Sequence, residues 1–133
     1  MKRVTLITGA SRGIGAATAR LCAADGHAVA INYRSDAEAA ERVRTEIESA
    51  GGTGIAVQGD TGIEADILRM FETVDQALGT VTGLVNNAGI HGPRGRLDVL
   101  GADDISRVLA VNVQGCFLCA REAVKRMSTK HGG

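Results

Sequence analysis

The chain has 133 residues, of which 44% are hydrophobic and 23% charged, the composition of a single globular domain. Its 15 basic residues balance 15 acidic ones, and aromatic residues make up only 2%. The chain therefore lacks the cationic surface and the stacking side chains on which nucleic-acid binding depends, so we expect no nucleic-acid partner.

Neither a membrane segment nor a disulfide framework is indicated. No apolar run approaches the roughly 20 residues that cross a bilayer, and Gly9 follows Met1 too closely for a signal peptide. The number of cysteines is odd, and Cys116 and Cys119 lie in a helical pattern with no second pair to complete a metal site. We therefore expect a cytoplasmic protein with reduced thiols and no membrane partner.

Short buried strands alternate with amphipathic helices, the pattern of βαβ units around a parallel sheet. Strands are expected at residues 4–8, 28–33, 54–57 and 82–86. A first helix is expected over 13–25, and its apolar face is formed by Ile14, Thr18, Leu21 and Cys22.

Two capping boxes predict the starts of the next helices, because each side chain of such a pair satisfies a free backbone amide. They are Ser35 with Glu38 and Thr61 with Glu64. A last, long helix is expected over 103–127.

Right-handed crossovers between four parallel strands give the sheet order 3-2-1-4, a doubly wound Rossmann arrangement of the α/β class. Ligands bind such sheets at the switch point, beyond the carboxyl ends of strands 1 and 4. Strand 4 would be an open apolar edge, and no strand follows the last helix. We therefore interpret the sequence as the first half of a doubly wound domain, truncated after strand 4 and the long helix.

The first strand leads directly into residues 8–15, Thr-Gly-Ala-Ser-Arg-Gly-Ile-Gly, which open a helix. Glycines remove the Cβ atoms that would hold a pyrophosphate away, while the free amides and dipole of the helix start attract the anion. A tight structural turn is the alternative. The spacing Gly-x-x-x-Gly-x-Gly differs from the common dinucleotide fingerprint Gly-x-Gly-x-x-Gly.

Together with three further motifs, this segment resembles the short-chain dehydrogenase/reductase family, in its compact single-domain branch, over the whole chain. Residues 86–89 match its Asn-Asn-Ala-Gly, Asp60 its acidic residue after strand 3, and Asn112 its mid-helix asparagine. The resemblance implies an oxidoreductase that transfers a hydride between a nicotinamide dinucleotide and a carbonyl or secondary alcohol.

The resemblance also implies where the cofactor lies, across the ends of strands 1 and 4. Ile14 would offer its amide to the pyrophosphate, and Asp60 with Thr61 would meet the adenine. The expected cofactor-binding residues are Gly9, Ser11, Arg12, Gly13, Ile14, Gly15, Tyr33, Arg34, Asp60, Thr61, Asn86, Ala88 and Gly89. Asp60 can instead be a turn residue, and Asn86 a buried tie within the sheet.

Asn112 is the one expected catalytic residue in the chain. It shares an apolar helical stripe, so its amide should point into the protein; the stripe contains Ile105, Val108, Leu109, Cys116, Cys119, Ala123 and Met127. The resemblance implies that this asparagine bends the helix and orders water beside a catalytic lysine. A purely structural amide with satisfied hydrogen bonds is the alternative.

The residues near the end of the second strand favour NADP(H) over NAD. Folds that bind NAD place an acid there for the ribose 2′-hydroxyl, whereas this chain has Tyr33 followed by Arg34. The planar guanidinium of Arg34 suits a 2′-phosphate, which Arg12 can approach from the other side. The alternative is that Arg34 is a solvated charge and that Asp36 reaches back to the ribose.

The family's reaction also requires a serine, a tyrosine and a lysine four residues after that tyrosine. The single tyrosine, Tyr33, is followed four residues later by Ala37. We therefore expect residues 1–133 to be the NADP-binding Rossmann half of an oxidoreductase, inactive alone because the catalytic segment is missing. The resemblance further implies a homo-oligomer, often a tetramer, with paired long helices.

Two other classes of protein remain open. One is a noncatalytic nucleotide-binding module that kept only the dinucleotide site, which would have to hide the strand 4 edge by association. The other is a different doubly wound nucleotide binder, such as an epimerase relative or a methyltransferase. Epimerase relatives usually space the glycines differently, and methyltransferases have an acid where Tyr33 stands.

Overall fold

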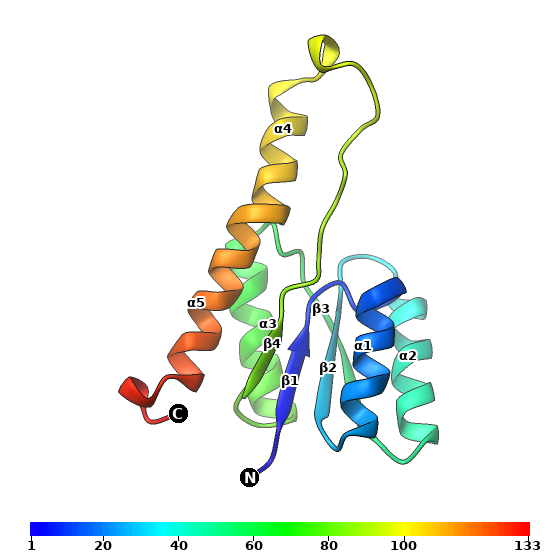
Figure 1. Cartoon of the computed structure of the whole chain (residues 1–133), viewed down its shortest axis with the longest axis vertical. Helices are drawn as coiled ribbons and strands as arrows, with labels where there is room; N and C mark the ends of the chain where they lie inside the picture. Colours follow the sequence, from blue (N-terminus) through cyan, green and yellow to red (C-terminus); the bar gives the residue numbers. More distant parts are fainter.

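The computed structural model describes all 133 residues, which fold around a parallel sheet with helices on both faces (Figure 1). The strands are β1 (Val4–Ile7), β2 (Ala28–Tyr33), β3 (Thr53–Gln58) and β4 (Gly83–Val85). Their order is β3-β2-β1-β4, and every neighbouring pair is parallel. The predicted Rossmann order is confirmed, with β4 as a short edge strand.

Helices cover both faces of the sheet. On one face lie α1 (Gly13–Ala24) and α2 (Ala37–Ser49), and on the other lie α3 (Glu64–Ala77) and α5 (Gly115–Met127). The fourth helix, α4 (Ala102–Leu109), runs through a π-helical turn at Ala110–Gln114 into α5. The long helix predicted over 103–127 is therefore one rod whose winding changes in the middle. Short 3-10 turns lie at Leu97–Val99 and Thr129–His131.

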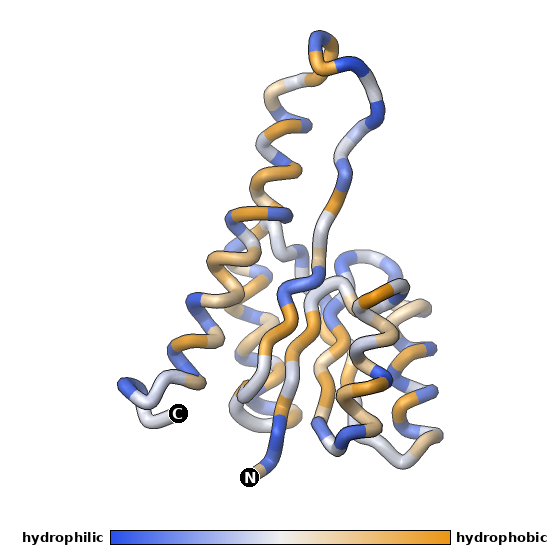
Figure 2. Tube along the Cα trace, viewed as in Figure 1, coloured by the Kyte–Doolittle hydropathy of each residue, from blue (hydrophilic) through white to orange (hydrophobic).

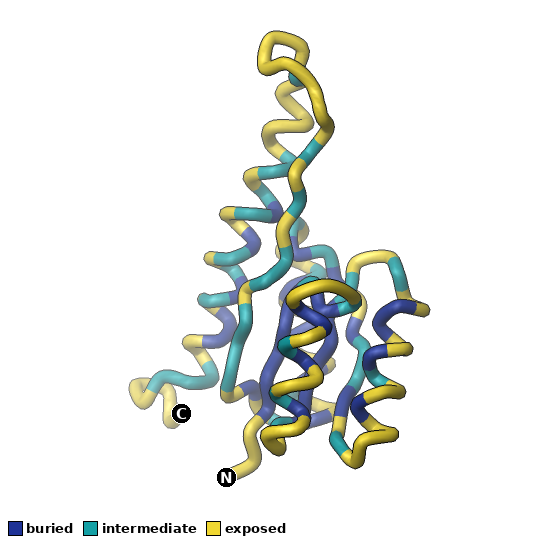
Figure 3. Tube along the Cα trace, turned by 45° about the vertical axis from the view of Figure 1, so that its right-hand side comes forward, coloured by how far each residue is buried: buried dark blue, intermediate teal, exposed yellow.

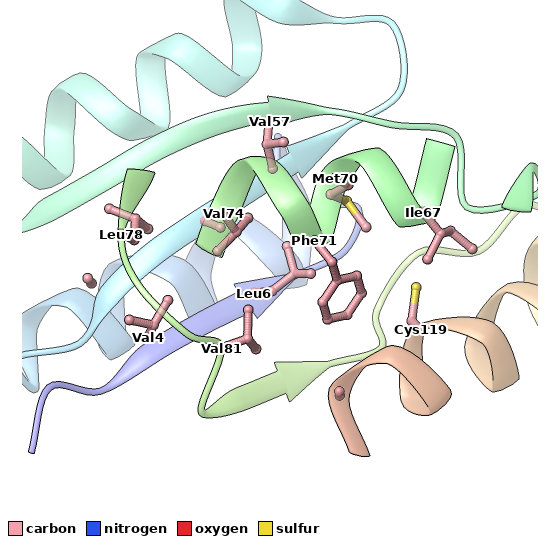
Figure 4. Packing of buried hydrophobic residues seen from close by; sticks show 13 residues of the cluster. Val4, Leu6, Val57, Ile67, Met70, Phe71, Val74, Leu78, Val81 and Cys119 are labelled. Atoms are coloured by element: carbon pink, nitrogen blue, oxygen red, sulfur yellow. The ribbon is translucent and has the colours of Figure 1, made fainter. Parts of the chain in front are cut away.

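Alternating side chains of the strands build two separate cores. Val4 and Leu6 belong to the core beneath α3 and α5, whereas Ile7 belongs to the core beneath α1 and α2. Because successive side chains of a strand point to opposite faces, a sheet covered on both sides needs such uninterrupted apolar strands. Figure 4 shows Phe71 and Met70 of α3 packed in the first core with Leu6.

The buried face of α1 is not the one predicted. Its buried residues are Gly15, Ala16, Ala19 and Ala23. Ile14 and Leu21 are instead 79% and 72% exposed. Small side chains let the helix lie close to the sheet, so the alanine stripe packs there although larger apolar residues stand on the opposite face.

Both predicted capping boxes are wrong. Helix α2 begins one residue later than expected, and its cap is Asp36, whose Oδ1 accepts from the backbone N–H of Ala39 at 3.0 Å. Helix α3 has Ile63 at its cap position and no side-chain cap. Ser35 and Thr61 lie instead in the loops at the carboxyl end of the sheet.

The segment from residue 90 through α4 extends beyond the sheet, and most of it is exposed (Figures 1 and 3). No residue of α4 is buried, and Ile105 and Leu109, predicted on an inward stripe, are exposed. Figure 2 shows apolar positions recurring along α4 and α5, and several of these side chains are exposed and do not pack against a core. None of the helices combines the length and the apolar character that crossing a membrane requires.

Candidate cofactor-binding site

A cleft of about 580 Å³ lies at the carboxyl ends of the strands, between the glycine-rich loop, the ends of β2 and β3, and the first part of the segment after β4. Every predicted cofactor-binding residue lines it except Gly15 and Asn86. Asp36, the alternative partner of the ribose, and Asn87 of the Asn-Asn-Ala-Gly motif also line it. Sequence reasoning assigned no cofactor contact to the remaining lining residues, which are Asn32, Ser35, Ile90, His91, Arg107 and Val111. The switch point of the sheet therefore carries the largest concave site of the fold.

The glycines of the loop have different structural roles. Gly9 and Gly13 have positive φ angles of 61° and 57°, which other residues adopt at a cost. A Cβ at Gly9 would lie 2.9 Å from the Cα of Ala88, whereas one at Gly13 would have no atom within 4 Å. Gly9 thus permits a close backbone approach, and Gly13 leaves open space at the start of α1.

Gly15, which does not line the cleft, is required by packing. A Cβ there would lie 2.5 Å from the carbonyl oxygen of Gly9 and 2.6 Å from Nδ2 of Asn87. These distances are too short for any side chain, so Gly15 lets α1 start directly against the loop.

The start of α1 offers free hydrogen-bond donors to the cleft. The backbone N–H groups of Gly13 and Ile14, two residues that line the cleft, donate to no acceptor in the chain, as is usual in a first helical turn. Together with the helix dipole and the open space at Gly13, they form a cradle that fits a phosphate group. The glycine loop therefore fits the pyrophosphate of a dinucleotide.

Asn32 at the end of β2 ties two loops of the cleft together. Its Oδ1 accepts from the backbone N–H of Gly9 at 3.1 Å, and its Nδ2 donates to the carbonyl of Gly59 at 3.0 Å. The side chain is buried and its amide is fully used. Its signal in the sequence was a polar residue inside an otherwise apolar strand.

Thr8 and Asn87 join β1 to β4 at the switch point. The Oγ1 of Thr8 accepts from the backbone N–H groups of Asn87 and Ala88, both at 3.0 Å. The Nδ2 of Asn87 donates to the carbonyls of Thr8 and Gly9, also at 3.0 Å. The Asn-Asn-Ala-Gly segment thus locks the glycine loop in place.

Asn86, the first residue of that segment, is exposed, and it donates from Nδ2 to the carbonyl of Cys116 at 3.1 Å. It therefore connects the end of β4 to α5 and is not the buried tie within the sheet that was one interpretation.

Basic side chains line the cleft where β2 ends. Tyr33 ends the strand and Arg34 follows it, and Arg12 reaches from the glycine loop to Asp36, with 3.2 Å between Nη2 and Oδ2. The Asp36 carboxylate is also occupied as the cap of α2. Of the two basic groups, Arg34 has no carboxylate partner.

Asp60 and Thr61 form the opposite part of the cleft and are mostly buried. The carboxylate of Asp60 accepts from the backbone N–H of Gly62 and from Nη2 of Arg107, both at 2.8 Å. Burial raises the pKa of Asp60, but the hydrogen bonds from Arg107 and Gly62 outweigh it and leave this pKa below its ordinary value. The backbone N–H of Thr61 donates to no acceptor in the chain. A carboxylate acceptor thus lies next to a free donor.

Asn112 lies in the π-helical turn, and its side chain holds the segment after β4. Its Oδ1 accepts from the backbone N–H of Ile90 at 2.8 Å, and its Nδ2 donates to the carbonyl of Ile90 at 2.7 Å. The residue is half-buried and does not itself line the cleft. Asn112 therefore fixes Ile90, which does line the cleft.

Comparison with known proteins adds a family match. The family model described as short chain dehydrogenase matches residues 3–133. The chain is 47% identical over 130 residues to the uncharacterized oxidoreductase YgfF of Escherichia coli, which covers 98% of this chain and 53% of that protein. It is 38% identical over 126 residues to 1-cyclohexenylcarbonyl-CoA reductase of Streptomyces collinus, covering 95% of this chain and 45% of that protein.

Solved structures are similar over the same range. A short-chain dehydrogenase/reductase of Serratia marcescens has a TM-score of 0.89 and 37% identity, covering 94% of this chain and 51% of that one. A short chain dehydrogenase of Burkholderia cenocepacia in complex with NADP has a TM-score of 0.88 and 43% identity, covering 95% and 51%. The chain spans about half the length of these relatives.

Proposed function

This chain belongs to the short-chain dehydrogenase/reductase family, and from this premise we propose that residues 1–133 are the NADP-binding half of an oxidoreductase. The complete protein would transfer a hydride between NADP(H) and a carbonyl or secondary alcohol. The observation that carries the proposal is the cleft at the switch point, which combines a phosphate cradle with an unpaired arginine beyond β2.

The preference for NADP(H) follows from the charges beyond β2. Arg34 lines the cleft and its guanidinium has no carboxylate partner, whereas Asp36, which follows it closely in the chain, is held by Arg12 and by the start of α2. A 2′-phosphate would gain charge-assisted hydrogen bonds there. The relative from Burkholderia cenocepacia was solved in complex with NADP, and another, a blue fluorescent protein from a metagenomic library, with NADPH.

Asp60 and Thr61 are suited to the adenine ring. Adenine presents an amino donor next to a ring-nitrogen acceptor. The Asp60 carboxylate can accept from the amino group, and the free backbone N–H of Thr61 can donate to the ring nitrogen. The cleft therefore has a complement for the adenine, for the 2′-phosphate of the adenosine ribose and for the pyrophosphate.

When bound, NADPH supplies a hydride to the carbonyl carbon, and the carbonyl oxygen takes a proton to give the alcohol. The residues of this chain bind and orient the cofactor. Through its two hydrogen bonds to the backbone of Ile90, Asn112 would shape the segment that borders the reacting end of the cofactor. The proton donor would belong to the other half of the complete protein, since Tyr33, the single tyrosine of this chain, ends β2 beside the basic residues.

We also propose that the protein is a homo-oligomer. Ile105, Leu109, Val113 and Phe117 recur every four residues along the rod formed by α4, the π-turn and α5, and all are exposed. Residues four apart lie on one face of a helix, so they form a continuous apolar stripe. A second copy of the chain would cover this stripe in the assembled protein.

The proposed function is tested by incubating the complete protein with NADPH and a panel of ketones, aldehydes and enoyl thioesters while the absorbance of the reduced nicotinamide is followed. We expect oxidation of NADPH that depends on a ketone or an aldehyde, with formation of the corresponding alcohol. A complete protein that binds NADPH but reduces no carbonyl would favour the noncatalytic nucleotide-binding module. Reduction of the enoyl thioester alone would contradict the proposed carbonyl chemistry.

A further inference from the structure

Arg107 connects α4 to the adenine end of the cleft. It extends from the helix to Asp60, with Nη2 and Oδ2 2.8 Å apart, and the two side chains are only 34% and 15% exposed. Gly62 makes room for this contact, because a Cβ at that position would lie 2.5 Å from Nη1 of Arg107. The guanidinium is therefore seated in a shaped space, unlike an arginine on a free surface.

The Asp60 segment is fixed from several sides, and Arg107 holds the part that faces α4. The backbone N–H of Asp60 donates to Oδ2 of Asp66 at 2.9 Å, and Oδ1 of Asp60 accepts from Gly62 at 2.8 Å. Neither of these bonds fixes Oδ2, so Arg107 is the contact that sets the plane of the carboxylate. An ionised carboxylate fixed in this way is an acceptor only.

We propose that Arg107 is a positioning residue for recognition of the adenine base, acting through the carboxylate of Asp60. This inference rests on the proposed function, in which Asp60 and the N–H of Thr61 meet the amino group and ring nitrogen of adenine. Arg107 orients the acceptor and keeps its charge, so the pair matches adenine and mismatches a base with the opposite donor and acceptor pattern.

Hypoxanthine has that opposite pattern, because a carbonyl replaces the amino group and the adjacent nitrogen carries a proton. The analogue of NADPH in which hypoxanthine replaces adenine keeps both phosphates, both riboses and the nicotinamide. A ratio of the two affinities therefore cancels any general effect of removing a cation from the cleft.

The experiment measures the dissociation constants of NADPH and of its hypoxanthine analogue by calorimetry for the complete protein and for Arg107→Met and Arg107→Lys. We expect the wild type to bind NADPH more tightly than the analogue. Arg107→Met should lower this preference about tenfold by weakening NADPH binding, and Arg107→Lys should restore part of it. Arg96→Met is the matched control, since Arg96 is exposed, pairs only with Asp98 and does not line the cleft.

The possible results distinguish a failure of the role assigned to Arg107 from a failure of the proposed placement of adenine at Asp60. If Arg107→Met binds both cofactors more weakly by the same factor, or leaves the preference intact, Arg107 does not position Asp60 for the base and the inference is wrong. If the wild type shows no preference between the two cofactors, Asp60 does not meet adenine, and the proposed placement fails together with the inference. Thermal unfolding of each variant establishes that the folded protein is compared.

Discussion

Side chains that shape the cleft without being expected to meet a cofactor were harder to foresee than the cofactor-binding motifs. The glycine-rich loop and residues 86–89 were recognisable because their spacing is local. Asn32 and Arg107 were missed because their partners, Gly59 and Asp60, come from other elements. A residue whose role depends on what the fold brings beside it carries a weak signal in the sequence.

Arg34 is the residue whose replacement most directly tests cofactor choice. In the complete protein, Arg34→Asp should weaken NADPH binding about tenfold or more, because a carboxylate would then repel the 2′-phosphate. It should strengthen NADH binding, since an acid at this point can accept from the ribose 2′-hydroxyl. Both dissociation constants can be followed by nicotinamide fluorescence.

Arg42→Asp is the control for this prediction, because Arg42 lies on the exposed face of α2, makes no ion pair and does not line the cleft. It makes the same change in net charge away from the site. An equal shift in cofactor preference for both variants would show that Arg34 acts only through net charge.

At the scale of elements, the periodic helices and strands were predictable, but the caps were not. Periodicity predicted a helix over 103–127 and the resemblance implied a bend at Asn112, and the structure has a π-helical turn at Ala110–Gln114. Gly115 begins α5, where a Cβ would be closer to the carbonyl oxygen of Thr61 than van der Waals contact allows. This glycine lets the rod lie against the loop that carries Asp60 and Thr61.

Gly115→Ala should therefore destabilise the fold, although alanine in a helix is usually favoured over glycine by about 1 kcal/mol. We expect a loss of about 1–3 kcal/mol in the free energy of unfolding, the usual range for overpacking. Urea denaturation measures it. Gly95→Ala is the control, since a Cβ there would lie 3.6 Å from Cγ2 of Val99, an ordinary contact. A stabilised Gly115→Ala variant would contradict the account of this contact.

A cluster of ion pairs surrounds Glu122 within α5, and a neighbouring pair, between Arg126 and Asp75, connects this helix to α3. The Glu122 carboxylate, 7% exposed, lies 2.8 Å from Nζ of Lys125 and 3.0 Å from Nε of Arg121. Arg126, next along the helix, pairs with Asp75 of α3 at 2.8 Å. Its guanidinium also lies 4.9 Å from the centre of the Phe71 ring.

Burial raises the pKa of Glu122, but the hydrogen bonds from Lys125 and Arg121 outweigh it and leave this pKa below its ordinary value. A lowered pKa in the folded state means that the ionised form stabilises the fold. This stability is present above the ordinary glutamate pKa, near about 4.3, and is lost as the pH falls through the folded-state value.

Glu122→Gln should lower the free energy of unfolding by about 2 kcal/mol at neutral pH, as expected for losing hydrogen bonds to charged groups. The difference in the free energy of unfolding between this variant and the wild type should shrink as the pH is lowered through the range in which carboxylates titrate. Urea unfolding across that range measures this, with Glu72→Gln, an exposed glutamate of α3 without an ion pair, as control. A deficit independent of pH would show that the carboxylate charge is not what stabilises the contact.

At the scale of the whole molecule, the sheet order and the place of the cleft could be predicted because four short apolar strands with right-handed crossovers leave few topologies. Which faces of the helices are covered could not. Hydrophobic periodicity assigned Ile105 and Leu109 to the interior, whereas both belong to an exposed stripe on a rod that extends past the sheet (Figure 3). Hydrophobic periodicity shows that one face of a helix is apolar, but it does not show which element or molecule covers that face.

Phe117, the last residue of this stripe and 74% exposed, tests the proposed association of copies. The complete protein should be an oligomer by light scattering, and Phe117→Asp should shift it to a smaller species by burying an unpaired charge in the interface. Because the side chain has little contact with its own chain, the variant should keep its thermal stability as a subunit. A monomeric wild type would contradict the proposed oligomer.

The most direct test of the central claim is a titration of the complete protein with NADPH and with NADH, followed by nicotinamide fluorescence. The phosphate cradle at Gly13 and the unpaired Arg34 predict saturable binding of both, with NADPH at least about tenfold tighter. Equal affinity for the two cofactors would contradict the assignment of NADP(H). The absence of saturable binding by either would contradict the identification of the cleft as a dinucleotide site.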